Sequence, residues 1–354
     1  MKISTDFCGG NAVILSEENG VVRFRQDLRD TDGDWFYWAF SVEGAEGTTV
    51  RFEMPQSYIG YFGAAVSHDL YHWDWTHTAN ENRTSFSYTF GKDENKIYFA
   101  HHMLYHPSRF MKFAELHGLR VRHLCDDNKG APILMTTVGE GSRNILLTSR
   151  HHCCESTGDY IIEGIIDEFM KHPIPDCRIT AIPFIDADGV IAGDQGKNRR
   201  PHDHNRDYGD WLYSGTRAVR DIVAKGDVIA AFDLHSPWHI SGRNDKVFCV
   251  RNSVKNVDDM KLFGKCFESS ITPDAMIYRT ENDIDPNEDW NDANKTTNCG
   301  SYCLKIAGVP LAFSLETTYF GEDGNVVSQD KLVATGRCFL EGFRKYLIEK
   351  GMLA

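Results

Sequence analysis

The sequence contains no apolar run of the roughly 20 residues that cross a bilayer, and its N-terminal segment MKISTDFCGGNAVILSEENG has no apolar core of signal-peptide length. It also lacks an excess of positive charge, because 51 acidic residues outnumber 38 basic ones and give a net charge of −13. Nucleic acids and anionic membranes select a basic surface. We therefore expect no nucleic-acid or membrane partner, a cytoplasmic location, and a small or peptide ligand.

Disulfide and linker signals are missing as well. No two of the ten cysteines are spaced as C-x-x-C, and proline and glycine are scattered rather than gathered into a linker. In a cytoplasmic protein the thiols stay reduced, so we expect them to be buried apolar groups or metal ligands. The chain has 354 residues, 41% hydrophobic and 25% charged, which is typical of one large or two smaller globular domains.

The character of the chain changes near residue 127. From residue 7 to 125, short β-type runs such as GVVRFRQDL and TTVRFEM alternate with turns, which predicts an all-β sandwich domain over residues 1–127. After the polar segment LCDDNKGAP, strand-like runs alternate with helical ones, which predicts an α/β domain over residues 128–354. In this domain we expect strands at PILMTTVG, NILLTS, ITAIPFID, VIAAFDL, DAMIYR and PLAFSLE, and helices at DYIIEGIIDEFMKH, TRAVRDIVAKG, DDMKLFGKCFESS and DKLVATGRCFLEGFRKYLIEK.

The segment TSRHHCCESTGDY holds two histidines, two cysteines and a glutamate within five positions. All of these side chains can bind zinc, so spacing leaves several ligand sets open. His152 and Glu155 lie three apart after the strand NILLTS, where α/β sheets place ligand sites. His235 ends another strand and by itself is more often structural. Together the three would leave a fourth position for water, which is typical of a catalytic zinc site.

Two further segments carry groups for catalysis and binding. Glu316 ends the apolar strand PLAFSLE, and beside a zinc-activated water a carboxylate can take the proton. The loop GKNRRPHDHNRDY contains Lys197, Arg199, Arg200 and Arg206. A guanidinium makes planar bidentate contacts to a carboxylate, so Arg206 suits a substrate with a free carboxylate end.

These segments, in this order, resemble the zinc metallocarboxypeptidase family. The matching motifs are RHHCCES, IDADG, DHNRDY, FDLHS and FSLETTY, and the resemblance covers residues 128–354. The β-type segments before residue 127 look like the sandwich that precedes the catalytic domain in the cytosolic carboxypeptidase branch. The resemblance implies a carboxypeptidase-like α/β/α sandwich with a mixed sheet, preceded by an all-β sandwich.

The resemblance also implies residue roles. His152, Glu155 and His235 would hold one Zn²⁺ per chain, and Glu316 would be the general base. Asn205 and Arg206 would hold the terminal carboxylate of a peptide or protein substrate. The sequence departs from the family at the oxyanion-stabilising arginine, whose position falls at Gly196 or Lys197, so we assign that role to Lys197 or Arg199. Residues 288–300 lack the tyrosine of digestive members, as cytosolic members do.

The side chain removed from the substrate is a separate question. Relatives that trim glutamate carry an arginine after a glycine about fifteen residues before the base, because a buried carboxylate needs a cation. Here Ser301 follows Gly300, and Lys305 lies four residues further on. We therefore assign Ser301 to substrate binding and expect a neutral terminal residue, with polyglutamate tails as poor substrates.

The remaining histidines have weaker signals. His68, His72 and His77 lack a spacing that would place all three on one face of a strand. We expect His101 and His102 to be structural. His202 and His204 flank the basic loop, where they could line the cleft, but we expect a solvated loop.

Other functions use the same groups. The prediction is a zinc-dependent metallocarboxypeptidase that hydrolyses the C-terminal peptide bond with metal-activated water and a glutamate base. A zinc amidase acting on a small acyl-amino-acid or a cell-wall-type peptide is the first alternative, and a non-catalytic peptide-binding protein is the second. The presence of Glu316 argues against the binding protein, which needs no base.

Overall fold

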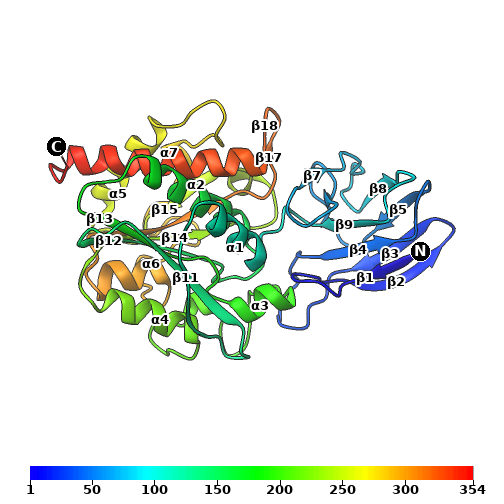
Figure 1. Ribbon diagram of the computed structural model, residues 1–354, viewed down its shortest axis with the longest axis horizontal. Helices are drawn as coiled ribbons and strands as arrows, with labels where there is room; N and C mark the ends of the chain where they lie inside the picture. The colour runs from blue at the N-terminus through cyan, green and yellow to red at the C-terminus, as the bar shows by residue number, and fades with distance from the viewer. Residues whose placement is uncertain (354) are drawn as a thin grey trace.

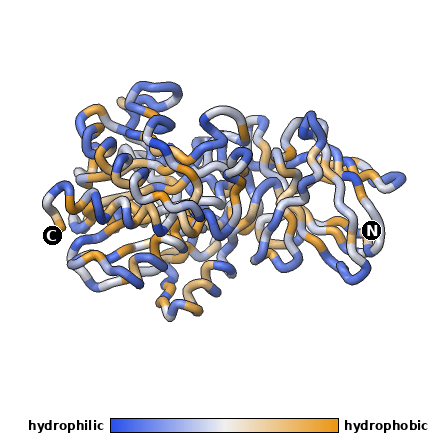
Figure 2. The backbone as a smooth tube through the Cα atoms, turned by 90° about the horizontal axis from the view of Figure 1, so that it is seen from above, coloured by the Kyte–Doolittle hydropathy of each residue, from blue (hydrophilic) through white to orange (hydrophobic). Residues whose placement is uncertain are grey.

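A computed structural model describes residues 1–353 of the chain. The molecule has two parts side by side, a smaller N-terminal part made of strands and a larger part built around one sheet, and the two termini lie at opposite ends (Figure 1). Apolar segments gather in the interior of both parts, while polar segments form the outer loops (Figure 2). Over the described residues, no helix combines the length and the apolar character needed to span a membrane.

Two sheets form the N-terminal part. The first has the order β1-β4-β9-β6-β7 and the second has the order β2-β3-β5-β8. The strands are β1 (Lys2–Ser4), β2 (Val13–Glu18), β3 (Val21–Arg25), β4 (Ala39–Glu43), β5 (Thr49–Glu53), β6 (Ala65–Ser67), β7 (Asp74–Trp75), β8 (Ser85–Thr89) and β9 (Lys96–Ala100).

One apolar core lies between these sheets. In β5 the buried residues Val50 and Phe52 alternate with exposed ones, so one face of the strand points inward. The ring of Phe52 lies 5.2 Å from that of Phe99 in the other sheet, measured between centroids. Both belong to a single cluster of buried residues. This packing is what the predicted sandwich requires.

The larger part contains a seven-stranded mixed sheet of order β10-β11-β13-β12-β14-β16-β15. Its strands are β10 (Val121–Asp126), β11 (Pro132–Val138), β12 (Arg143–Ser149), β13 (Cys177–Ile182), β14 (Val228–His235), β15 (Val247–Val250) and β16 (Leu311–Thr317). β12 is parallel to β13 and β14, and β14 is parallel to β16, whereas the outer pairs are antiparallel. The mixed sheet with its helices confirms the predicted α/β class.

Helices cover both faces of this sheet (Figure 1). One face carries α2 (Thr157–Lys171), α5 (Val257–Glu268) and α7 (Gln329–Glu349), and the other carries α4 (Ser214–Val223) and α6 (Cys299–Ser301). Glycines let α2 and α7 approach closely, because a Cβ atom on Gly164 would lie 1.9 Å from the carbonyl oxygen of Val333. The shorter helices are α1 (Pro107–Leu116), between the two parts, and α3 (Ala187–Ala192).

One strand prediction is wrong. The segment DAMIYR forms no strand and contributes only an isolated bridge from Tyr278 to Val247. The edge position beside β16 is taken instead by β15, which the sequence analysis missed. Its four residues are too short a run for a clear alternation pattern, and pairing with a neighbouring strand rather than local preference makes them extended.

The two parts of the molecule are joined by buried contacts. The side-chain amide of Asn11 donates to the carbonyl oxygen of Gly193 at 2.7 Å, and the backbone N–H of Tyr37 donates to Gln195 Oε1 at 2.9 Å. The strand β10 already pairs with β11, so the large sheet begins before residue 127. The division at 127/128 stays a prediction.

Candidate active site

Three strands of the large sheet end at one place. The parallel strands β12, β14 and β16 run in the same direction, so their carboxyl ends share one edge of the sheet. His152 and Glu155 follow β12, His235 ends β14, and Glu316 lies at the end of β16 directly opposite His235. Ligand sites in α/β sheets occupy this edge. The topology therefore brings together side chains from three distant parts of the sequence.

His152, Glu155 and His235 converge. The backbone N–H of Glu155 donates to the carbonyl oxygen of His152 at 3.0 Å, which closes a tight turn and places both side chains on one side. Glu155 Oε1 lies 2.9 Å from His152 Nδ1, and Glu155 Oε2 lies 2.7 Å from His235 Nδ1. One donor atom from each residue lies within 4.8 Å of the others, and all three side chains are buried.

The chemistry of this group fits a divalent metal ion. Both ring nitrogens of His152 are buried, and neither forms a hydrogen bond of acceptable geometry among the described residues, although Glu155 Oε1 lies 2.9 Å from Nδ1 and Asp203 Oδ1 lies 3.4 Å from Nε2. A buried polar atom without a partner is costly and calls for an explanation such as a bound ion. Two imidazole nitrogens with one carboxylate form a ligand set that suits zinc and leaves a position open.

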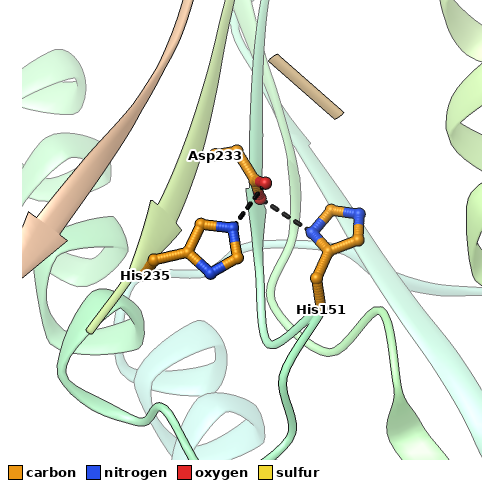
Figure 3. A group of neighbouring side chains, drawn as sticks. All are labelled: His151, Asp233 and His235. Atoms are coloured by element: carbon orange, nitrogen blue, oxygen red, sulfur yellow. Dashed lines mark hydrogen bonds and ion pairs between the residues drawn. The ribbon is translucent and has the colours of Figure 1, made fainter. Parts of the chain in front are cut away.

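Asp233 holds the rings of His235 and His151 (Figure 3). Its Oδ2 atom lies 2.6 Å from His235 Nε2, and its Oδ1 atom lies 2.8 Å from His151 Nδ1. Because Nε2 of His235 donates to this carboxylate, Nδ1 is left to face Glu155. A carboxylate behind a histidine ligand sets the ring orientation and raises its basicity.

Asp203 takes a similar place behind His152, with Oδ1 at 3.4 Å from Nε2. The sequence analysis gave no role to Asp203 or Asp233. For Asp233 the one local signal was the Asp-x-His spacing in FDLHS. For Asp203 there was no local signal, because its partner His152 is 51 positions away.

A cavity of about 440 Å³ opens over this group. Glu316 lines it and is only 7% exposed, and burial raises the pKa of its carboxyl to about 7. The cause is desolvation of the charged form, to which the nearby Glu155 carboxylate adds and which His235 opposes. A carboxyl with this pKa can accept and release a proton near neutral pH.

Asn205 and Arg206 lie beside the group and line the same cavity. The side chain of Asn205 is held through Oδ1, which accepts from the backbone N–H of Cys299 at 2.9 Å, and its Nδ2 lies 3.1 Å from His235 Nε2. The guanidinium of half-buried Arg206 donates to the carbonyl oxygen of Asn205 at 2.8 Å. Within residues 1–353 it forms no ion pair, so its charge is available to a ligand.

The two residues predicted for oxyanion stabilisation have different positions. Lys197 lines the cavity, with Nζ at 3.4 Å from Glu155 Oε1 and 5.4 Å from the ring centroid of Trp35. Arg199 is not among the residues that line the cavity. Its guanidinium pairs with Asp186, with Asp194 at 3.1 Å and with Asp30 of the N-terminal part at 2.9 Å. The structure brings Lys197 to the site and does not bring Arg199.

Ser301 also lies outside the lining of the cavity. It is 1% exposed, and its hydroxyl oxygen lies 3.4 Å from Lys305 Nζ. A basic residue from the preceding segment, Lys295, does line the cavity, although it was not singled out from the sequence. Two tryptophans, Trp238 and Trp35, form another part of the wall, and Trp35 comes from the N-terminal part.

The neighbours of the ligands in the segment RHHCCES shape the turn. The carbonyl oxygen of Cys153 accepts from Arg150 Nε at 2.6 Å, and that of Cys154 lies 2.8 Å from His102 Nε2. His204 is 2% exposed, so the expectation of a solvated position is wrong for this residue. Among the described residues, no group of possible metal ligands includes His68, His72 or His77.

We compared the sequence and the fold of the chain with those of known proteins. A scan of protein-family models finds no match. The chain is 17% identical to a metallo-carboxypeptidase from Pseudomonas aeruginosa, solved in complex with (2-guanidinoethylmercapto)succinic acid, with a TM-score of 0.82 over 99% of this chain and 100% of that one. For a metallo-carboxypeptidase from Burkholderia cenocepacia the TM-score is 0.81, at 17% identity over 99% of both chains.

The chain has the fold of a metallocarboxypeptidase. In sequence, this metallocarboxypeptidase-like chain is 25% identical over 229 residues to "Cytosolic carboxypeptidase 2" of Xenopus tropicalis. The match covers 55% of this chain and 23% of that protein, so it spans about a quarter of the length of the relative. The predicted resemblance to the metallocarboxypeptidase family and its cytosolic branch is thereby confirmed.

Proposed function

We propose that this protein is a zinc-dependent metallocarboxypeptidase that hydrolyses the C-terminal peptide bond of a peptide or protein. One observation carries the proposal. His152, Glu155 and His235 converge beside a cavity that is also lined by a buried carboxyl group, Glu316, and by Arg206, whose guanidinium forms no ion pair within residues 1–353. A metal ion, a base and a carboxylate partner in one cavity are what cleavage next to a free C-terminus needs. The proposal also includes two domains divided at 127/128, a sandwich architecture in both domains and a cytoplasmic location.

His152, Glu155 and His235 would hold the metal. When bound, a zinc ion supplies Lewis-acid chemistry and lowers the pKa of a coordinated water molecule to about 7. Asp233 and Asp203 orient the two histidine rings from behind, so the ligand atoms are directed before the metal arrives.

Arg206 and Asn205 bind and position the substrate. The guanidinium of Arg206 donates to both oxygens of the terminal carboxylate. The amide of Asn205, fixed by the backbone of Cys299, gives a further polar contact next to His235. These contacts place the last peptide bond of the substrate over the metal ligands.

Glu316 moves the proton. Its carboxylate takes a proton from the attacking water and delivers it to the leaving amine, and a pKa of about 7 suits both steps. Lys197, with its ammonium beside Glu155, stabilises the negative charge that develops on the carbonyl oxygen. Arg199 does not take this role, because three carboxylates hold its guanidinium away from the cavity.

Glu316→Gln tests the reaction. The protein is incubated with a mixed peptide library, and mass spectrometry follows the loss of C-terminal residues. The native protein should shorten peptides from the C-terminus, and Glu316→Gln should lower the rate by about 10²- to 10⁴-fold because the amide accepts no proton. The exposed Glu281→Gln is the matched control and should be as active as the native protein. A native protein that binds peptides but leaves them intact would instead indicate a binding protein.

The metal is tested separately by elemental analysis. Replacement of His152, Glu155 or His235 by alanine should remove the ion from this site, because two remaining protein ligands hold zinc poorly. Glu316→Gln should retain it. Native metal content in His152→Ala would show that the ion is bound elsewhere.

A further inference from the structure

A second group of possible metal ligands lies outside the proposed active site. It consists of Asp127, Asp186 and His204, which are 4%, 1% and 2% exposed. Asp127 follows β10, Asp186 precedes α3, and His204 lies in the loop that leads to Asn205 and Arg206. One donor atom from each residue lies within 4.8 Å of the others. Asp186 and His204 lie within the motifs IDADG and DHNRDY, but no role was predicted for them there, and the proposed reaction uses none of the three residues.

The imidazole of His204 has no partner. Both ring nitrogens are buried and lack a hydrogen bond within the described residues. Its Nδ1 atom lies 3.7 Å from Asp186 Oδ2, which is too long for a hydrogen bond. It is close to the separation of about 3.4 Å between two ligands of a tetrahedral ion with bonds of about 2.1 Å. The ring is held in place by Tyr213, which stacks on it at 3.7 Å between centroids.

The two carboxylates are fixed by their surroundings. The oxygens of Asp127 accept from the backbone N–H groups of Asn128 at 2.9 Å and Asp188 at 3.1 Å. Asp186 Oδ1 accepts from the N–H of Gly189 at 2.9 Å, and Oδ2 pairs with Arg199. A carboxylate oxygen has more than one lone pair, so each residue can still bind an ion. The bonds present therefore direct both groups without saturating them.

The local charge favours a cation. Arg199 is the basic residue paired with Asp186, and it also forms ion pairs with Asp30 and Asp194. Arg29 also pairs with Asp194 at 3.0 Å, so two guanidinium groups face four carboxylates, those of Asp30, Asp127, Asp186 and Asp194. Buried carboxylates that face each other repel, and a bound cation removes that repulsion.

We propose that Asp127, Asp186 and His204 form a second metal site for a divalent transition-metal ion, with zinc the first choice. An imidazole with carboxylate ligands suits zinc or manganese better than calcium or magnesium, which prefer oxygen alone. The ion would tie together the end of β10, the start of α3 and the segment just before Asn205. Its role is structural, because none of its three ligands lines the cavity, and it would hold the segment that carries Arg206.

Metal counting tests this site independently of the active site. The native protein, purified without chelators, should contain about two transition-metal ions per chain by plasma mass spectrometry. Asp127→Asn should contain about one, and the neighbouring exposed Asp126→Asn, the matched control, should contain about two. His152→Ala should also contain about one ion, but at the second site. Circular dichroism shows whether each variant is folded.

Crystals of His152→Ala provide a second measurement that needs no substitution in the second site. Anomalous scattering at the zinc edge should show a peak between Asp127, Asp186 and His204. If the native protein holds one ion that Asp127→Asn retains and His152→Ala loses, the second site is wrong and the proposed active site stands. If the single ion is lost in Asp127→Asn and kept in His152→Ala, the second site stands and the proposed catalytic metal is wrong. A protein without metal would overturn both.

Discussion

The carboxylate of Asp233 accepts a hydrogen bond from His235 Nε2 at 2.6 Å (Figure 3). This contact leaves His235 Nδ1, 2.7 Å from Glu155 Oε2, as the nitrogen that can bind a metal. An aspartate behind a ligand acts through the ligand, so its loss should weaken metal binding without removing it.

Asp233→Asn should weaken zinc binding by about 10- to 100-fold, because the amide no longer enforces one tautomer and one orientation of the ring. Competition with a chromogenic chelator measures the dissociation constant. Asp221→Asn, on the exposed surface of α4, is the control and should bind zinc like the native protein. Equal affinities of all three proteins would show that Asp233 has no role in positioning His235.

Arg206→Ala should selectively impair cleavage of substrates with a free C-terminal carboxylate. Loss of the charged partner costs about 2 to 5 kcal/mol, which lowers kcat/KM for free acids and hardly changes it for peptide amides. The measurement compares matched peptides with free and amidated ends. The exposed Arg120→Ala is the control. If the native protein cleaves both forms equally, Arg206 does not bind the carboxylate.

Substitutions of Lys295 and Ser301 test which of these two residues determines the preference for the terminal residue of the substrate. Lys295 lines the cavity and Ser301 is buried outside its lining, so Lys295 is the group that can meet a substrate side chain. Lys295→Gln should lower the ratio of kcat/KM for C-terminal glutamate to that for C-terminal leucine by about two- to fivefold, as expected for one lost charge contact at an exposed position. Ser301→Ala should leave this ratio unchanged. A change in the ratio for Ser301→Ala alone would restore the role predicted from the sequence.

Stability should fall as the pH decreases below about 6.5, the pKa of an unperturbed histidine. His239 is buried between the two parts of the molecule, with Nε2 at 3.0 Å from the carbonyl oxygen of Ser57 and Nδ1 at 2.8 Å from His101 Nε2. Burial lowers the pKa of His239 to about 4. Between pH 6.5 and 4 the unfolded chain therefore binds a proton that the folded chain does not, and folding becomes less favourable.

At pH 5 this difference corresponds to about 2 kcal/mol for His239 alone. Urea unfolding at pH 7.5 and pH 5 measures the effect. The loss of stability between these values should be smaller by that amount in His239→Gln than in the native protein. His72→Gln, whose side chain is 81% exposed, should lose as much as the native protein. An equal loss in His239→Gln would mean that His239 is not kept neutral by the fold.

Local sequence pattern predicts the α/β sheet and the strand ends at which functional groups gather. Strand runs that are apolar throughout predict a buried sheet, and polar residues at the ends of such runs stand out. His152, Glu155, His235 and Glu316 all follow this rule, and parallel strands bring such ends to one edge. The α/β class and the gathering of these strand ends could be predicted from local pattern, whereas the choice of His152 and Glu155 over His151, Cys153 and Cys154 came from the resemblance to the metallocarboxypeptidase family.

Which other charged side chains reach the site depends on tertiary packing. Arg199 and Lys197 are two positions apart in one loop, yet Asp30 of the N-terminal part draws Arg199 away while Lys197 faces Glu155. Ser301, which was assigned to substrate binding from the sequence, lies outside the cavity lining, and Lys295 lines the cavity instead, because the packing of their segment decides which side chain faces the cavity. Long side chains in loops have no periodicity that fixes their direction, so their partners come from segments far away in the sequence, and no local pattern contains that information.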